Sequence, residues 1–357
     1  MNQELINAFK SKDILSVKSI LASGVDLNYR TPGTPTYLNR AWCGQRDYDF
    51  EIVKLLIEFG ADLNDSSYPA IGCAAGRGSI EEIQYVLDRG ADINAVTHVG
   101  TSALWQAAYK GNIEILKFLL STGIDIYKHG GHALQVASSY GHLEIVELLV
   151  KEKANINFQV FNKNDVDLSQ TPLHCSASFG QLQIAQFLLE NGADPTLKNY
   201  YGERPYIIAK RRKNNVLADI FASYEPKELR DLDEIMAKLK RVGLPVTILK
   251  DLGEERRRVE LPESKYMNYF EYCSIHDVTE IEIEIEGIKM FNLLFETKGY
   301  DSLGFLVWIP SKKALGSYDA EHQSLIILHD TDWKGFKKSP SAIIDRILDG
   351  EYEVVHP

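Results

Sequence analysis

A short phrase recurs between residues 24 and 196 of this 357-residue chain: glycine or a substitute, then Ala-Asp-hydrophobe-Asn or a near variant. Its copies begin at Gly24, Gly60, Gly90, Gly123, Lys153 and Gly192. The first and last copies lie 168 residues apart over five intervals, a mean period of about 33.6 residues. A period of this length indicates stacked helical units, each of which buries its apolar face only against its neighbours. This repeat restricts the fold more than any other feature of the sequence.

Each phrase follows an apolar segment with the period of a helix. In EIVKLLIEF (51–59), NIEILKFLL (112–120) and HLEIVELLV (142–150), Ile, Val and Leu recur at i, i+3, i+4 and i+7. That spacing predicts helices packed on one face. The glycine that follows ends such a helix in the left-handed conformation without steric cost, and Lys153 replaces it once.

A shorter helix is expected upstream of each long one. The segment TPLHCSASFG (171–180) resembles the TPLHxAA signature of the ankyrin repeat family almost letter for letter, and weaker copies occupy 37–42, 68–78, 101–111 and 131–141. The resemblance covers residues 1–225. It implies an all-α solenoid of about six to seven repeats, with polar units capping both ends, that binds another protein on its concave face.

Aligning the units on the glycine between their two helices predicts which side chains line that face. The predicted contacts are Arg77, Trp105, Tyr109, Lys110, Tyr140, Phe179 and Arg212. Aromatic residues and arginine dominate interface energies. Two alternatives stay open, because Trp105 suits the core equally well and Phe179 could pack under a long loop at 158–168.

The chain carries a net charge of −11. Residues 230–357 hold 17 Lys/Arg against 24 Asp/Glu, and the first 229 residues hold 22 against 26. Both parts repel a phosphate backbone, so we expect a basic protein partner and no nucleic acid. The basic runs KRRKNN (210–215) and EERRR (254–258) are interpreted as a solvated end unit and a charged loop, with a nuclear signal or nucleic-acid patch as the alternative for the first.

Neither a membrane segment nor a cofactor site is expected. No apolar run approaches the ~18–20 residues that cross a bilayer, and the first residues lack an apolar signal core. The four cysteines are far apart and form no zinc-ligand pattern. We therefore expect a cytoplasmic protein without a cofactor or metal; its oligomeric state is left open.

The pattern changes near residue 226, after which period-two segments predict a small α+β domain with a mainly antiparallel sheet over 226–357. One helix is expected within 225–243 and another, broken near Pro340, within 333–350. Strands are expected at 244–251, 257–261, 268–275, 301–310 and 323–330, with a hairpin around Gly287 and a last short strand.

Two clusters in this domain could carry function. The carboxylates Glu280, Glu282, Glu284 and Glu286 alternate along one strand face and could receive a basic partner, or could be a solvated edge that resists aggregation. The second cluster is Asp319, Glu321, His322, His329 and Asp330. Its spacing matches no known catalytic or metal motif, so a turn stabilised by side-chain hydrogen bonds is the favoured interpretation and we expect no enzyme.

The YDAEH turn (318–322) and the helix led by Trp333 resemble, in style, small domains of bacterial toxin-immunity proteins. The leading hypothesis is therefore a protein-binding chain, of immunity or antitoxin type, that masks a basic partner stoichiometrically. A scaffold that joins two partners is the second hypothesis. An enzyme with its active site in the C-terminal domain is the third.

Overall fold

The computed structural model divides the chain into two compact units. It describes residues 2–29, 34–44, 47–160, 169–199, 202–253, 256–276, 278, 280–283, 288–297, 305–319 and 324–355. Unit 1 comprises Met1–Val160 and Gln170–Asp194, and unit 2 comprises Phe161–Ser169 and Pro195–Pro357. Each unit is described by itself. The predicted domain boundary at residue 225 stays a prediction.

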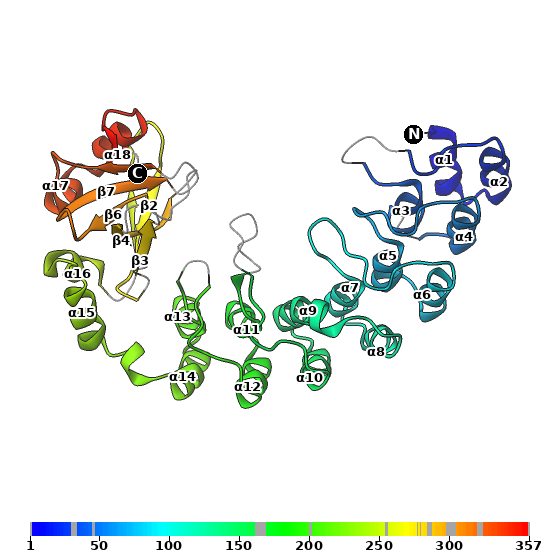
Figure 1. The fold of residues 1–357 in the computed structure, drawn as a ribbon, viewed down its shortest axis with the longest axis horizontal. Coiled ribbons are helices and arrows are strands. Elements are labelled where there is room, and N and C mark those ends of the chain that lie inside the picture. The colour runs from blue at the N-terminus through cyan, green and yellow to red at the C-terminus, as the bar shows by residue number, and fades with distance from the viewer. Residues whose placement is uncertain are drawn as a thin grey trace. The chain divides into compact units, whose positions relative to one another are not determined.

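Unit 1 is built from pairs of antiparallel helices (Figure 1). The first helices of the pairs are α1 (Gln3–Ser11), α3 (Tyr37–Trp42), α5 (Ala70–Arg77), α7 (Ala103–Lys110), α9 (Ile126–Tyr140) and α11 (Pro172–Phe179). The second helices are α2 (Ile14–Ala22), α4 (Phe50–Glu58), α6 (Ile80–Leu87), α8 (Ile113–Ser121), α10 (Leu143–Lys151) and α12 (Leu182–Glu190). Within unit 1 the first helices form one row and the second helices another, which confirms the predicted repeat.

Short polar residues begin these helices. Asp49, Ser79 and Asn112 each accept a backbone N–H of the first turn and satisfy a donor that the helix itself leaves open. At α11, Thr171 and His174 form a reciprocal capping box, and both are fully buried. The signature segment is therefore a helix start whose polar atoms bond to one another inside the core.

The asparagine of the recurring phrase ties one repeat to the next. The Asn64 side chain donates to the carbonyl oxygen of Gly90 (3.0 Å) and accepts the backbone N–H of Asp92 (2.8 Å). Equivalent bonds join Asn28 to Gly60 and Asp62, Asn94 to Asp125, and Asn157 to Asp194. We call this series the asparagine ladder.

The fifth pair departs from the expected pattern. The prediction placed its first helix at 131–141, whereas α9 begins at Ile126 with Asp125 as its cap. Tyr127 occupies the ladder position and is 80% exposed. Gly131 is required inside this helix, because a Cβ there would lie 2.3 Å from the ring of Phe158. A continuous helix thus stands where other repeats have an irregular connection.

Unit 2 begins with a seventh helix pair, α13 (Pro205–Arg211) and α14 (Asn215–Tyr224). A 3-10 turn (Lys227–Leu229), α15 (Leu232–Arg241) and α16 (Val246–Leu252) follow. Ion pairs join Glu203, 2% exposed, to Arg211 (2.9 Å) and to Arg256. Both predicted basic runs therefore contribute an arginine to one nearly buried carboxylate.

The rest of unit 2 is an antiparallel α+β arrangement, as predicted. Among the described residues the strands form two sheets, ordered β1-β2-β5 and β3-β4-β6-β7-β8-β9. Their bounds are β1 (Arg257–Glu260), β2 (Tyr269–Tyr272), β3 (Glu280–Ile283), β4 (Ile288–Asn292), β5 (Leu294–Thr297), β6 (Val307–Ile309), β7 (Ala314–Asp319), β8 (Ser324–Ile327) and β9 (Val354–Val355). The helices α17 (Trp333–Lys338) and α18 (Pro340–Leu348) break at Pro340, and Phe336 and Ile344 enter the core with Phe270.

One predicted element of unit 2 is wrong, and one observed strand was not predicted. Residues 244–251 were expected as a strand, but most of them form α16, since Ile248, Leu249 and Leu252 share one buried helical face. Strand β7 was not expected, because its residues at 314–317, Ala-Leu-Gly-Ser, have little strand propensity. It nevertheless pairs with both β6 and β8 in the larger sheet.

Candidate functional site

Aromatic rings from α7, α9 and the loop after α10 pack in a continuous series in unit 1. Trp105 stacks on Tyr109 with ring centroids 5.2 Å apart, and Tyr109 meets Tyr140 edge-on at 4.8 Å. His132 lies 5.9 Å from Trp105 and 6.4 Å from Phe158. We call the set Trp105, Tyr109, His132, Tyr140 and Phe158 the aromatic strip.

Helical spacing and one glycine position the strip. Trp105 and Tyr109 are four residues apart on α7, so their side chains lie one above the other. Tyr140 is the last residue of α9, directly before Gly141, whose φ of +81° ends the helix. The ammonium group of Lys110 lies 5.2 Å from the Tyr109 ring centroid.

The strip is only partly covered by protein. Tyr140 is 55% exposed, and Trp105 and Tyr109 are half-buried. Partial burial and the neighbouring Tyr109 hydroxyl raise the pKa of Tyr140. The phenol is protonated at neutral pH, as a tyrosine with an ordinary pKa also is, and can donate a hydrogen bond. The surface combines large apolar area with polar tips, which suits contact with another polypeptide.

Three other residues predicted to contact a partner, Arg77, Phe179 and Arg212, lie outside the aromatic strip. Arg77 donates to the carbonyl oxygen of Cys43 (2.7 Å), so this arginine also fastens α5 to the end of α3. Phe179, at the end of α11, is 62% exposed; most of the loop considered as its cover, 161–168, lies outside the described residues. Arg212 is exposed at the end of α13 and belongs to unit 2.

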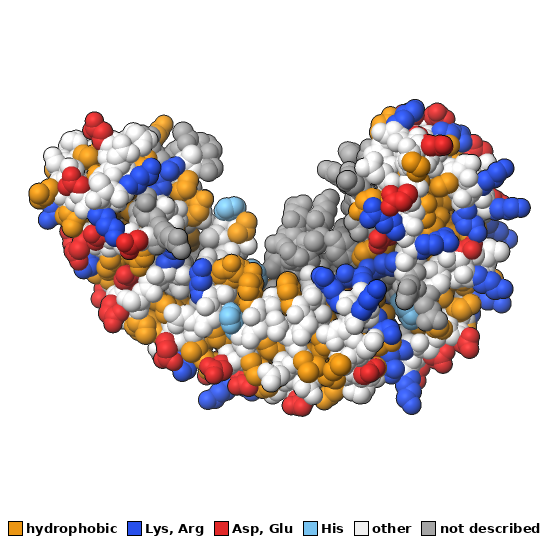
Figure 2. Space-filling view, turned by 180° about the vertical axis from the view of Figure 1, so that it is seen from behind, with side chains coloured by type: hydrophobic (Ala, Val, Ile, Leu, Met, Phe, Trp, Pro, Cys, Tyr) orange, Lys and Arg blue, Asp and Glu red, His pale blue; other side chains and the backbone are white. Residues whose placement is uncertain are grey.

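The acidic hairpin is described only in part. Glu280 on β3 forms an ion pair with Lys289 on β4 at 2.7 Å, and Lys289 also lies opposite Glu282 in the strand register. Glu284 and Glu286 lie outside the described residues. At least one of the predicted carboxylates is thus neutralised within the hairpin. Acidic and basic side chains are also mixed over the face seen in Figure 2.

The second C-terminal cluster is not gathered into one site in the described part of the chain. The carboxylate of Asp330 accepts from Arg346 (2.7 Å) and from the Tyr352 hydroxyl (3.0 Å). The Arg346 hydrogen bond lowers the pKa of this carboxyl. Glu321 and His322 lie outside the described residues, and no group of three potential metal ligands occurs among those that are described.

Comparison with known proteins identifies the repeat. The family model for ankyrin repeats, in three copies, matches residues 74–160 and 104–199. Residues 74–199 are ankyrin repeats. Repeats of this family indicate a protein-binding role. Among the described residues, no helix is long and apolar enough to cross a membrane.

Several curated proteins share the ankyrin repeats. Over 186 residues the chain is 34% identical to the ankyrin repeat and KH domain-containing protein mask-1 of Caenorhabditis elegans, covering 51% of this chain and 7% of that protein. It is 29% identical over 217 residues to the putative ankyrin repeat protein YahD of Escherichia coli, with 60% and 91% covered. The mouse B-cell lymphoma 3 protein homolog is 29% identical over 174 residues, with 46% and 38% covered.

Two members of the aromatic strip were not predicted from the ankyrin motif. His132 follows the glycine that opens the recognised segment at 131, and Phe158 lies three residues beyond Asn155 of the phrase KANIN. Their contact crosses between α9 and the loop after α10, which the repeat period does not encode. The available signal was the pair of adjacent glycines at 130 and 131, which leaves room for a ring.

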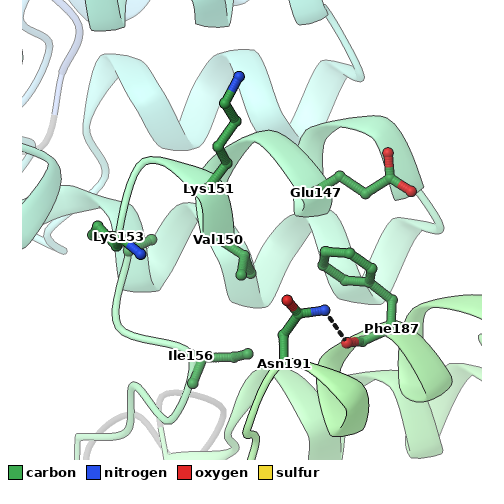
Figure 3. A pocket seen from close by; sticks show the side chains of 8 residues that line it. Glu147, Val150, Lys151, Lys153, Ile156, Phe187 and Asn191 are labelled. Carbon is green, nitrogen blue, oxygen red and sulfur yellow. Dashed lines mark hydrogen bonds between the residues drawn. The ribbon is translucent and has the colours of Figure 1, made fainter.

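A pocket of about 620 Å³ lies against the second helices α10 and α12 of the ankyrin repeats (Figure 3). The side chains of Val150, Ile156, Phe187 and Asn191 face a common space, whereas Lys151 points away from it. The Asn191 amide donates to the Phe187 carbonyl oxygen (2.8 Å) and is already bonded locally. This open depression is lined by as many polar or charged residues as apolar ones.

Proposed function

We propose that the chain is a non-catalytic, cytoplasmic protein that binds a polypeptide partner through the aromatic strip. The observation that carries this proposal is the continuous packing of Trp105, Tyr109 and Tyr140, with Tyr140 55% exposed. Preordered aromatic side chains bury much area on binding and lose little conformational entropy, which is why they recur at the centres of interfaces.

We further propose that the partner is basic and that binding masks it stoichiometrically, in the manner of an immunity or antitoxin protein. The net charge of −11 supports a basic partner, because a negative surface speeds association with a positively charged protein and repels a negatively charged one. The resemblance of the C-terminal segment to toxin-immunity domains supports the inhibitory role. The four cysteines, all among the described residues, are free thiols, which supports a reducing compartment.

Site-specific photocrosslinking tests the surface. A benzoylphenylalanine at position 140 should crosslink one abundant partner in cells that carry the gene, and the additional change Trp105→Ala should reduce the yield at least about tenfold. Position 127 is the matched control, since Tyr127 belongs to the same unit and is 80% exposed but lies outside the strip. Equal crosslinking from both positions would refute the assignment.

The inhibitory role needs a separate measurement. Mass spectrometry of the crosslinked band identifies the partner, whose isoelectric point should be above neutral. The partner's toxicity or enzymatic activity should then disappear at one equivalent of this chain. A partner that is acidic, or that keeps full activity at saturation, would exclude the masking role and leave protein binding intact.

A scaffold that joins two partners is the second candidate. The observation that favours it is a separate, chemically different groove in unit 2, described below. A variant with the strip disabled should lose one partner and keep the other, and a variant with the groove disabled should show the reverse. That result would support a scaffold over simple inhibition.

A further inference from the structure

Unit 2 contains an open groove of about 1270 Å³ that the proposed function does not use. Three elements border it: α16, the turn between β6 and β7, and α17. Trp308 on β6 and Leu328, directly after β8, contribute to its apolar wall. The groove exceeds the ~300–1,000 Å³ typical of small-molecule pockets and is open to solvent, so a polypeptide segment suits it better than a compact ligand.

Lysines dominate the rim of this groove. Each bordering element contributes at least one: Lys250, Lys312, Lys313, Lys334 and Lys337. All five are exposed. Of these five lysines, only Lys337 has an ion-pair partner among the described residues, Asp251 at 2.5 Å. Four lysines therefore line one groove without a direct ion pair to a carboxylate in the described part of the chain.

The carboxylates in the groove are already engaged. Asp330 is held by Arg346, and Asp332 caps α17 by accepting the backbone N–H of Gly335 (2.7 Å). Asp251 accepts from the indole N–H of Trp333 (2.7 Å) as well as from Lys337. Counting the lining residues alone, five lysines face three aspartates. A net positive groove is unexpected in a segment, residues 230–357, that carries 17 basic and 24 acidic residues.

Trp308 provides an apolar contact beside these charges. Its ring is half-buried, and its indole N–H donates to the carbonyl oxygen of Gly243 (2.8 Å). The polar edge of the indole is thus satisfied within unit 2. The remaining ring surface is available to an apolar side chain of a ligand.

We propose that this lysine groove binds an acidic polypeptide segment in which carboxylates alternate with apolar side chains. Ammonium groups on flexible stems can follow carboxylates at varied positions, whereas planar recognition of phosphate favours arginine, and the lining contains none. The aspartates of the lining and the overall charge of −11 repel any anionic ligand, and they repel nucleic acid more strongly than a peptide whose carboxylates are spaced by apolar residues, because every nucleotide carries a phosphate charge. The groove thereby adds a partner whose charge is opposite to that expected for the aromatic strip.

Fluorescence anisotropy on the full chain tests this inference. The probe is a fluorescein-labelled peptide, (Glu-Leu-Asp-Gly) repeated three times, titrated at about 50 mM salt. The triple variant Lys250→Glu, Lys312→Glu, Lys334→Glu should raise the dissociation constant at least about tenfold. Lys313 is left unchanged because its backbone is left-handed, with φ of +50°.

A charge-matched variant separates the groove from net charge. Lys18→Glu, Lys128→Glu, Lys238→Glu changes the charge by the same amount on α2, α9 and α15, at exposed positions outside the lining. It should leave the dissociation constant within about twofold, and unchanged thermal unfolding of both variants confirms folding. Equal loss in the two variants would overturn the proposal, as would no loss in the groove variant.

Two further titrations identify the class of ligand. A peptide with Lys in place of Glu and Asp should not bind in the groove, so any binding of this peptide should not be weakened in the groove variant. A labelled 12-nucleotide single-stranded DNA should bind the wild-type chain at least about tenfold more weakly than the acidic peptide. If the DNA binds as tightly as the peptide, and the groove variant abolishes both, the groove is a nucleic-acid site and the polypeptide assignment is wrong.

Discussion

Removing one step of the asparagine ladder should destabilise the ankyrin repeats by an amount that the hydrogen bonds predict. The Asn64 side chain makes two bonds to the next repeat, whereas Asn94 makes one. A net contribution of about 0.5–1.5 kcal/mol per bond gives about 1–3 kcal/mol for Asn64→Ala and about half of that for Asn94→Ala. Since Asn64 is exposed and water can replace its bonds, we expect the lower part of that range.

Urea unfolding followed by circular dichroism measures these differences. Asn7→Ala is the control, because Asn7 is exposed in the middle of α1 and its side chain bonds only within that helix. Hydrogen exchange adds a local measurement, since Asn64→Ala should speed exchange of the Asp92 amide, which loses its acceptor. If Asn94→Ala costs as much as Asn64→Ala, or if both behave like the control, the ladder does not couple the repeats as argued.

Three other changes have outcomes that the structure predicts. Lys153→Gly should stabilise the chain by about 0.5–1 kcal/mol in urea unfolding, because Lys153 holds the left-handed conformation (φ +67°) that glycine adopts in other copies; no gain would contradict this. Glu203→Gln should lower the free energy of unfolding by about 3–5 kcal/mol in urea unfolding, because it leaves the charge of nearly buried arginine uncompensated. Glu51→Gln, in an exposed ion pair, should lower it by less than about 1 kcal/mol. The pKa of Asp330 is lowered by the Arg346 hydrogen bond, so this carboxylate adds stability above about pH 4 that is lost as the pH falls through its lower folded pKa. Carboxyl NMR titration should therefore show this pKa rising in Arg346→Ala, and an unchanged value would exclude the pair as its cause.

The repeat was predictable because two independent sequence signals indicate it. Apolar residues at helical spacing predicted the second helices, and the glycine that follows predicted where they end. Aligning the repeats on the glycine between their two helices predicted that Trp105, Tyr109 and Tyr140 line one surface. The structure places their rings in contact. Whether that surface binds a partner remains a prediction.

Short elements were less predictable because local preference was ambiguous. Residues 246–248, Val-Thr-Ile, are β-branched and favour a strand, yet burial of Ile248 and Leu252 on one face makes α16 a helix. Gly316 lowers the strand propensity of β7, but a Cβ there would lie 2.7 Å from the carbonyl oxygen of Ile326, so close strand packing requires it. The lysine groove was not predicted, since its lysines come from three separate segments of the chain, at 250, 312–313 and 334–337.

The long helix α9 has a consequence for how the array comes apart. With Tyr127 at the ladder position, no asparagine bond links the fourth and fifth pairs among the described residues. Ring and helix packing couple these two neighbours, and in a linear array each junction sets how far a local opening spreads. Under mild denaturant we expect this junction to become the boundary between two cooperative segments once the ring packing between α7 and α9 is removed, with the pairs before it and those after it melting separately.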